Sequence, residues 1–342
     1  MEPAPKTAAA SEATVMAAAR KLAALRGKPC LLFVSPFINE ETVFAVHEKC
    51  RVHGHRTAAL DLVVHSPGGY VRHAYLVARE LRRRFRSIAV FVPVQATSAA
   101  ALICLAADEI ILGALGELGP LDAQFEEKQK DDLPEERSAM TTFRTFDQLN
   151  GLAKDLFSEV LGAFVENGVR LPEASRNATD LTGILYRDLY AKIDPSHVAE
   201  AARGQEQGMY YIERLLKRYR PHGFSDKTRE AVHALVHDYP AHDFVVDLEE
   251  LQELGFPARR AAGGEIQALD DLAQGLRALS AGRPADEAEE AGPSIIEFLS
   301  PGRNGARRPA VRRHPAKPRN HAEGNGKRNR VRPAAAGVKN GR

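Results

Sequence analysis

A serine and a pair of glycines are the residues whose types and spacing could carry out chemistry in this sequence. Gly68 and Gly69 follow a proline in "VHSPGGYV" (64–71), and Ser98 comes about thirty residues later in "ATSAAALICLAADEI" (96–110). Glycine lets main-chain N–H groups turn outward toward a ligand. A hydroxyl in the first turn of a helix lies at the positive end of the helix dipole, which favours a developing alkoxide. We therefore predict Ser98 as a nucleophile, with the N–H groups of Gly69 and Ala99 stabilising an oxyanion.

Structural explanations compete for the same residues. A Gly-Gly pair is common in a plain connection between a strand and a helix, and a phosphate loop is a weaker alternative because neither glycine-rich phosphate motif is present. Ser98 could be an N-cap, and Thr97 is interpreted as a cap or a core hydroxyl. Only the order of strand, Gly-Gly turn, helix, strand, serine and apolar helix favours catalysis.

The elements that would position these residues alternate along the first third of the chain. Apolar runs predict strands at 29–37, 59–66, 87–94 and 108–113, and amphipathic spacing predicts helices at 12–26, 40–52, 70–85 and 98–107. Short apolar strands that alternate with helices predict an α/β fold with a mostly parallel sheet covered on both faces.

The composition changes after residue 125. We expect a charged loop at 126–142 and helices at roughly 143–167, 173–192, 196–219 and 226–237, followed by a strand and a helix within 243–257. The predicted organisation is a helical extension at 1–28, a core with the nucleophile at 29–125, a helical remainder of the same domain at 143–300, and a basic disordered tail at 301–342.

Charge divides the chain into an acidic body and a basic tail. The whole sequence has 47 Lys and Arg against 45 Asp and Glu, and residues 301–342 hold 13 of the bases but one of the acids. The body therefore carries 34 bases and 44 acids. A tail of this composition buries too little apolar surface to fold alone, and we expect it either to stay solvated or to contact nucleic acid or another acidic partner.

The cysteines and the hydropathy of the sequence limit which class of protein this can be. Cys30, Cys50 and Cys104 lack the spacing of a metal site or of a disulfide framework, so we expect no metal, no organic cofactor and a reducing compartment. No segment has the roughly 18–20 consecutive apolar residues that span a bilayer. The expectation is a cytoplasmic protein without a membrane contact.

The motif order resembles that of a known family. "HSPGG" (65–69), "TSAAALICLAADEIILGALGELGPLDAQ" (97–124), "HDYPAHDFVVDLEELQELGFP" (237–257) and "PSIIEFL" (293–299) resemble the serine dehydrogenase proteinase family, which lies near signal peptide peptidase A within the ClpP/crotonase fold. The resemblance covers roughly 30–300. It implies a ββα spiral that forms homo-oligomers, with Ser98 as nucleophile and the Gly68-Gly69 turn in the oxyanion hole. The family's usual Ser-Ala-Gly is replaced here by Ser98-Ala99-Ala100.

The general base is open to several residues. A serine nucleophile needs a histidine or a lysine kept neutral by burial within hydrogen-bond reach. No histidine lies between His73 and His197, and relatives with a Ser-Lys dyad have their lysine some tens of residues downstream. Lys154, flanked by apolar helical positions, is the preferred candidate, and a solvated lysine paired with Asp155 or Glu159 is the structural alternative. The other candidates are Lys128, Lys130, Lys192, His237 and His242.

The sequence thus predicts a serine peptidase that cleaves peptides or unfolded proteins by a Ser-Lys-like mechanism. Two other functions stay open. One is a catalytically inactive, peptide-binding oligomeric scaffold. The other is a crotonase-type acyl-CoA enzyme, in which the same N–H groups would polarise a thioester.

Overall fold

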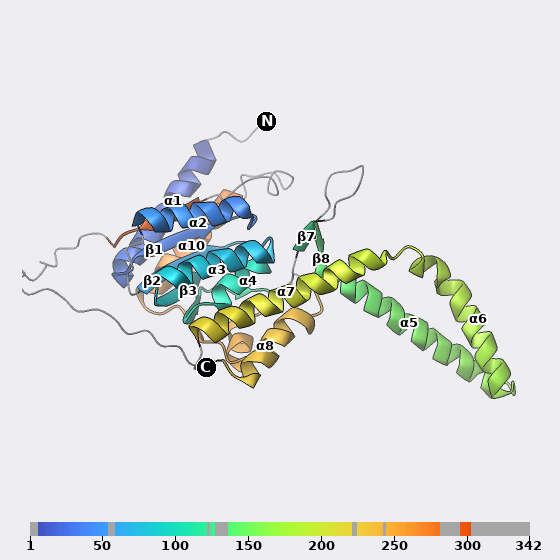
Figure 1. Ribbon diagram of the computed structural model, residues 1–342. Helices are drawn as coiled ribbons and strands as arrows, with labels where there is room; N and C mark the ends of the chain where they lie inside the picture. Colours follow the sequence, from blue (N-terminus) through green and yellow to red (C-terminus); the bar gives the residue numbers. More distant parts are fainter. Residues whose placement is uncertain are drawn as a thin grey trace, which may run out of the picture. The chain divides into compact units, whose positions relative to one another are not determined.

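Apolar strands and amphipathic helices combine into a six-stranded sheet in the computed structural model of this chain (Figure 1). The structure describes residues 6–53, 59–121, 124–126, 136–220, 224–241, 244–280 and 295–301. The sheet has the strand order β10-β1-β2-β3-β5-β9, and its strands are Cys30–Val34 (β1), Ala59–His65 (β2), Ser87–Val92 (β3), Glu109–Leu112 (β5), Ala258–Arg260 (β9) and Ile295–Leu299 (β10). All neighbouring pairs are parallel except β1 and β10. The predicted α/β class with a mostly parallel sheet is confirmed.

Successive side chains of each strand enter two separate cores. In β1, Leu31 and Phe33 pack on one face, while Cys30, Leu32 and Val34 pack on the other. Because both faces of the central strands are buried, β1 and β3 are almost wholly apolar instead of alternating with polar residues.

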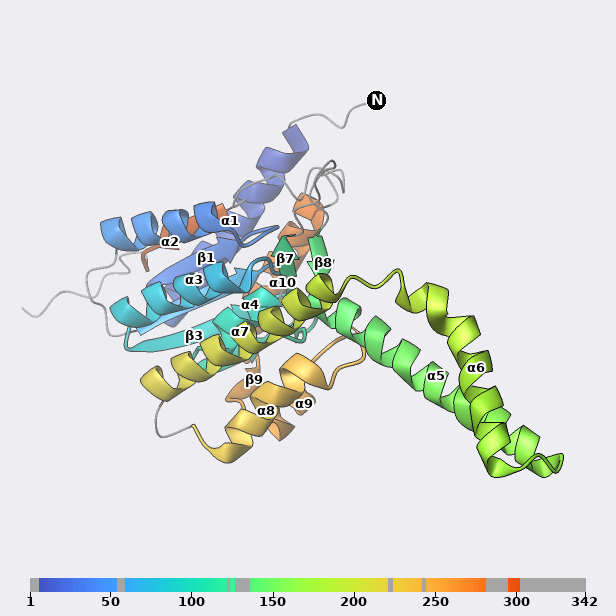
Figure 2. The same cartoon turned by 45° about the vertical axis from the view of Figure 1, so that its right-hand side comes forward.

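Helices cover both faces of the sheet (Figures 1 and 2). The helices Lys6–Arg26 (α1) and Gly264–Ser280 (α10) pack against each other on the smaller core. The larger core is covered by Glu40–His53 (α2), Val71–Arg84 (α3), Ala99–Leu105 (α4), Pro195–Tyr219 (α7), Asp226–His237 (α8) and Leu248–Glu253 (α9). The predicted extension at 1–28 is therefore a packed layer of the fold, because α1 buries one face of the sheet.

Two helices form a hairpin beside this core. Ala139–Glu166 (α5) packs against Leu171–Tyr190 (α6) and against α7, and both views show the pair extending away from the sheet. The strand Glu136–Ser138 (β8) and the start of α5 lie within the range predicted as a loop. β8 pairs with Gln124–Glu126 (β7), and residues 127–135 of that range lie outside the described residues.

The remaining small strands lie next to Ser98. Gln95–Ala96 (β4) pairs with Glu117–Leu118 (β6), and Leu118 forms an antiparallel bridge with Val246. The strand predicted within 243–257 is reduced to this bridge, and α9 follows it. The chain divides into a unit Met1–Gly302 and a unit Arg303–Arg342, and the predicted tail lies outside the described residues after Pro301.

Candidate active site

Ser98 has an unusual backbone at the first turn of α4. Its φ is 51° and its ψ is −127°, and it is the one non-glycine residue with positive φ among the described residues. Such a conformation costs of order 1–3 kcal/mol and persists where the surroundings enforce it. The Ser98 side chain makes no capping hydrogen bond to α4. The N-cap alternative for the hydroxyl is therefore wrong, although Ser98 occupies the N-cap position.

The glycine turn lies directly against this serine. A Cβ added to Gly68 would lie 2.6 Å from Ser98 Cβ and 2.9 Å from Ser98 Oγ, and Gly68 has a φ of +124°. A Cβ added to Gly69 would lie 2.4 Å from the backbone nitrogen of Ile38. Both positions therefore require glycine, because any side chain would displace either Ser98 or the neighbouring backbone.

The residues around the glycine turn lie between two neighbouring segments and hydrogen-bond to both, to Ile38 on one side and to Gln95 and Thr97 on the other. On one edge, Ile38 N–H donates to Gly68 O at 2.8 Å and Tyr70 N–H donates to Ile38 O at 2.9 Å. On the other edge, Ser66 and Thr97 are joined by the Thr97 N–H, which donates to Ser66 O at 3.1 Å. Parallel pairing alternates the direction of successive N–H groups. The pairing with Ile38 uses Gly68 O and the Tyr70 N–H, and the Gly69 N–H takes no part in it.

Ser66 forms a hydrogen bond with Gly68 of the glycine pair, and the sequence did not lead us to predict a role for Ser66. Its Oγ accepts a hydrogen bond from Gly68 N–H at 3.1 Å. The Gly68 N–H is thereby engaged within the turn, so Gly69 is the better candidate for an oxyanion donor, and the missing Cβ of Gly68 leaves space for Ser98. A serine two residues before a glycine turn is a known signal for this local hydrogen bond, and it could have been used here.

Thr97 fixes the other side of the site. Its Oγ1 donates to Pro67 O at 2.8 Å, so this hydroxyl joins two loops and is neither the helix cap nor the core hydroxyl that was predicted. The hydrogen bond ties the residue before Ser98 to the residue before the two glycines. Ser98, Gly68, Gly69 and Ala99 are thus brought together by short-range contacts of the backbone.

The site is dry, and its electrostatics follow from that. Ser98 and Ala99 are buried at 0% and 1% exposure. His65, at the end of β2, has its pKa lowered to about 4 by burial, against a backbone hydrogen bond with Gln95 that raises it. Burial also raises the pKa of Glu117 in β6. In such surroundings, fixed N–H dipoles stabilise negative charge far better than they do in water.

The candidate bases that the structure describes lie on or next to three different helices. Lys154 is exposed on α5, where its carbonyl accepts from Ser158 Oγ at 2.9 Å, and Lys192 is exposed beyond α6. His237 ends α8 beside His233, with ring centroids 4.5 Å apart, and its pKa is lowered chiefly by desolvation. Lys128, Lys130 and His242 lie outside the described residues.

In the described part of the chain, no group of three or more His, Cys, Asp or Glu side chains could hold a metal ion. None of the described helices combines the length and the apolar character needed to cross a bilayer.

Comparisons with known proteins indicate a family for the N-terminal part of the chain. Residues 14–133 match the family described as ClpP-like SDH-type serine proteinases, which confirms the resemblance seen in the motifs. Two uncharacterized proteins of Methanocaldococcus jannaschii are similar to this chain. One is 29% identical over 180 residues, which is 52% of this chain and 61% of that protein, and the other is 38% identical over 66 residues, which is 19% and 23%. The chain thus spans less than two thirds of either relative.

A solved structure also matches part of the chain. It is a mutant of the membrane-bound stomatin-specific protease 1510-N, with a TM-score of 0.26 and 12% identity, covering 42% of this chain and 66% of that one. A similarity at this level carries no argument about function.

Proposed function

We propose, starting from the match of residues 14–133 to ClpP-like SDH-type serine proteinases, that this chain is a serine peptidase with Ser98 as its nucleophile. The observation that carries the proposal is the strained backbone of Ser98 against a glycine turn that admits no side chain. A core serine needs neither feature. Backbone strain that is held in place next to a preorganised turn is typical of catalytic sites.

The mechanism follows from the placement of these groups. Ser98 Oγ attacks the carbonyl carbon of a peptide bond and gives its proton to the base, while the N–H groups of Gly69 and Ala99 stabilise the oxyanion. The tetrahedral intermediate expels the amine, which takes the proton from the base. Water then attacks the acyl-serine ester, the carboxylic acid leaves, and Ser98 regains its proton.

Lys154 is the base in this proposal, and it requires a second copy of the chain. A lysine accepts a proton at neutral pH when burial disfavours its charged form. Lys154 is exposed in the single chain, so burial has to come from an assembled oligomer. Exposed apolar residues on the same hairpin support such an assembly, among them Leu152 and Ile184, which are 50% and 63% exposed.

A fluorophosphonate probe tests the nucleophile directly. We expect the wild-type chain to form a covalent adduct and Ser98→Ala to form none, because the probe reacts with an activated serine. Since Ser98 is buried, a small probe is a better first test than a protein substrate. Ser175→Ala, on α6, is the matched control and should label like the wild type. Equal labelling of Ser98→Ala and the wild type would refute the proposal, and mass spectrometry of the adduct identifies the modified residue.

A peptide-binding scaffold without catalysis is the second candidate, and the exposure of Lys154 favours it. The two functions differ in one experiment. A scaffold would form oligomers and bind unfolded casein without labelling or cleaving, whereas the peptidase would cleave it.

Compartment and tail complete the proposal. Three buried, free cysteines support a reducing compartment such as the cytoplasm.

The charge of residues 301–342 supports a salt-sensitive contact of this segment with nucleic acid or an acidic partner.

A further inference from the structure

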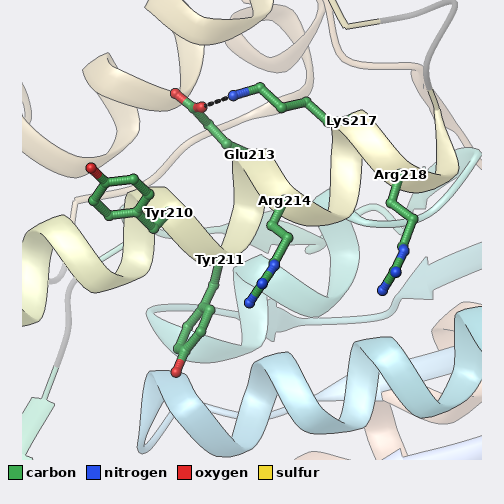
Figure 3. A pocket seen from close by; sticks show the side chains of 6 residues that line it. All are labelled: Tyr210, Tyr211, Glu213, Arg214, Lys217 and Arg218. Atoms are coloured by element: carbon green, nitrogen blue, oxygen red, sulfur yellow. Dashed lines mark hydrogen bonds and ion pairs between the residues drawn. The ribbon is translucent and has the colours of Figure 1, made fainter. Parts of the chain in front are cut away.

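The exposed face of α7 carries a pocket that the proposed peptidase does not use (Figure 3). Its volume is about 700 Å³, within the range of small-molecule sites. We call it the α7 pocket, and it is lined by Tyr210, Tyr211, Glu213, Arg214, Lys217 and Arg218.

Two arginines give the α7 pocket an uncompensated positive charge. Among the described residues, no hydrogen bond or ion pair is recorded for the guanidinium group of Arg214 or of Arg218, and Figure 3 shows both side chains extending to the same side of α7. They are four residues apart on one helix, where two like charges destabilise the helix. A bound anion would remove this cost.

The single acid of the α7 pocket is already neutralised. Glu213 pairs with Lys217, the contact drawn in Figure 3, and its second oxygen lies 3.6 Å from Arg229 Nε. Lys217 is also placed over the Phe224 ring, 4.9 Å from its centroid. Glu213 therefore leaves the charge of Arg214 and Arg218 available to a ligand.

Aromatic stacking holds α7, the helix that lines the α7 pocket, against α3. Tyr211 stacks on Tyr75 of α3 with ring centroids 4.3 Å apart and an interplanar angle of 10°, and the guanidinium of Arg79 lies 5.7 Å from the Tyr75 centroid. The contact fixes α7 against α3. A second phenol ring, that of Tyr210, is 70% exposed one turn before Arg214.

We propose that the α7 pocket binds a nucleoside phosphate, with its phosphates on Arg214 and Arg218 and its base on the Tyr210 ring. Arginine pairs with phosphate through two parallel hydrogen bonds, and an exposed aromatic ring stacks on a base. A long polyanion fits less well, because residues 1–300 carry ten more acids than bases and repel it. The ligand is therefore compact.

Calorimetric titration of the full-length chain with ADP, with adenosine and with pyrophosphate tests the proposal. We expect saturable binding of ADP and pyrophosphate and none of adenosine. The double variant Arg214→Gln with Arg218→Gln should weaken ADP binding at least about tenfold, since each charge-assisted pair contributes more than the 1.4 kcal/mol that a factor of ten represents. Tyr210→Ala should weaken ADP binding and leave pyrophosphate binding unchanged.

Arg176→Gln with Arg187→Gln, two exposed positions of α6, is the matched control with the same change of charge. It should bind ADP as the wild type does. The proposal is overturned if the wild type does not bind ADP, if the α7 variant binds as tightly as the wild type, or if the control loses as much affinity. An unchanged ADP affinity of Tyr210→Ala would overturn the stacking of the base. Fluorophosphonate labelling stays independent of all these outcomes.

Discussion

At the scale of single residues, the site depends on the missing Cβ of a glycine, on one engaged N–H group and on a buried histidine ring. Gly68 lacks a Cβ, which leaves space for Ser98, and the Gly68 N–H donates to Ser66 Oγ, so the proposed oxyanion donor is Gly69. The imidazole ring of His65 is buried. Burial disfavours its charged form and lowers the pKa of His65 to about 4 from an ordinary value near 6.5. This last residue makes stability depend on pH.

The sign of that dependence follows from proton binding. Between pH 6.5 and 4 the unfolded chain binds a proton at His65 and the folded chain does not, so stability falls as the pH is lowered. The loss at pH 4 amounts to about 3 kcal/mol. Denaturant unfolding at pH 7 and pH 4.5 should show a weaker pH dependence for His65→Gln than for the wild type. His314→Gln, in the tail sequence, serves as control, and an identical pH dependence in His65→Gln would contradict the assignment.

At the scale of elements, one buried arginine connects α3, α4 and β5. Arg82 is 5% exposed, and its Nε donates to Ala106 O at 2.6 Å just beyond the end of α4. Its two terminal nitrogens donate to the Asp108 carboxylate at 2.7 and 2.9 Å, and that carboxylate accepts from Ile88 N–H at 2.8 Å. The helix that begins at Ser98 is thereby tied down at its far end.

Removal of this arginine tests the connection. Arg82→Met would leave the Ala106 carbonyl and the Asp108 carboxylate without their partner, at a cost of about 2–4 kcal/mol in the free energy of unfolding. Urea unfolding measures the loss. The exposed neighbour Arg83 gives the control, because Arg83→Met should change stability by less than about 0.5 kcal/mol. Equal effects of the two substitutions would show that the buried pair is not important for stability.

At the scale of the whole molecule, the hairpin of α5 and α6 carries surface that a single chain leaves uncovered. The exposed apolar residues of this hairpin, each at least 39% exposed, are Leu152, Val165, Leu171, Leu181, Ile184, Leu185 and Leu189. Exposed apolar residues gathered in this way mark a protein interface. The proposed homo-oligomer would bury them together with Lys154.

Light scattering after gel filtration tests this assembly. Ile184→Asp with Leu185→Asp should shift the particle mass toward the 37.4 kDa of a single chain, because two carboxylates would be buried in the interface. Phe44→Asp, at an equally exposed position of α2, should leave the mass unchanged. A wild-type chain that already runs as a monomer, or a hairpin variant with the wild-type mass, would contradict the proposal. Loss of fluorophosphonate labelling in the dissociated variant would further support a base supplied on assembly.

The sequence alone determined the class of fold and half of the site. Apolar runs of strand length between amphipathic helices predict a parallel sheet covered on both faces. Gly68, Gly69 and Ser98 could be identified from the sequence because a tight turn requires glycine and the serine precedes an apolar helix. The tertiary structure decided what depends on partners distant in sequence. β10 joins the sheet beside β1, the unpredicted α10 covers one face with α1, and Ile38 pairs with the glycine turn. The exposure of Lys154 was equally undetermined, because an amphipathic helix pattern does not reveal what covers each of its faces.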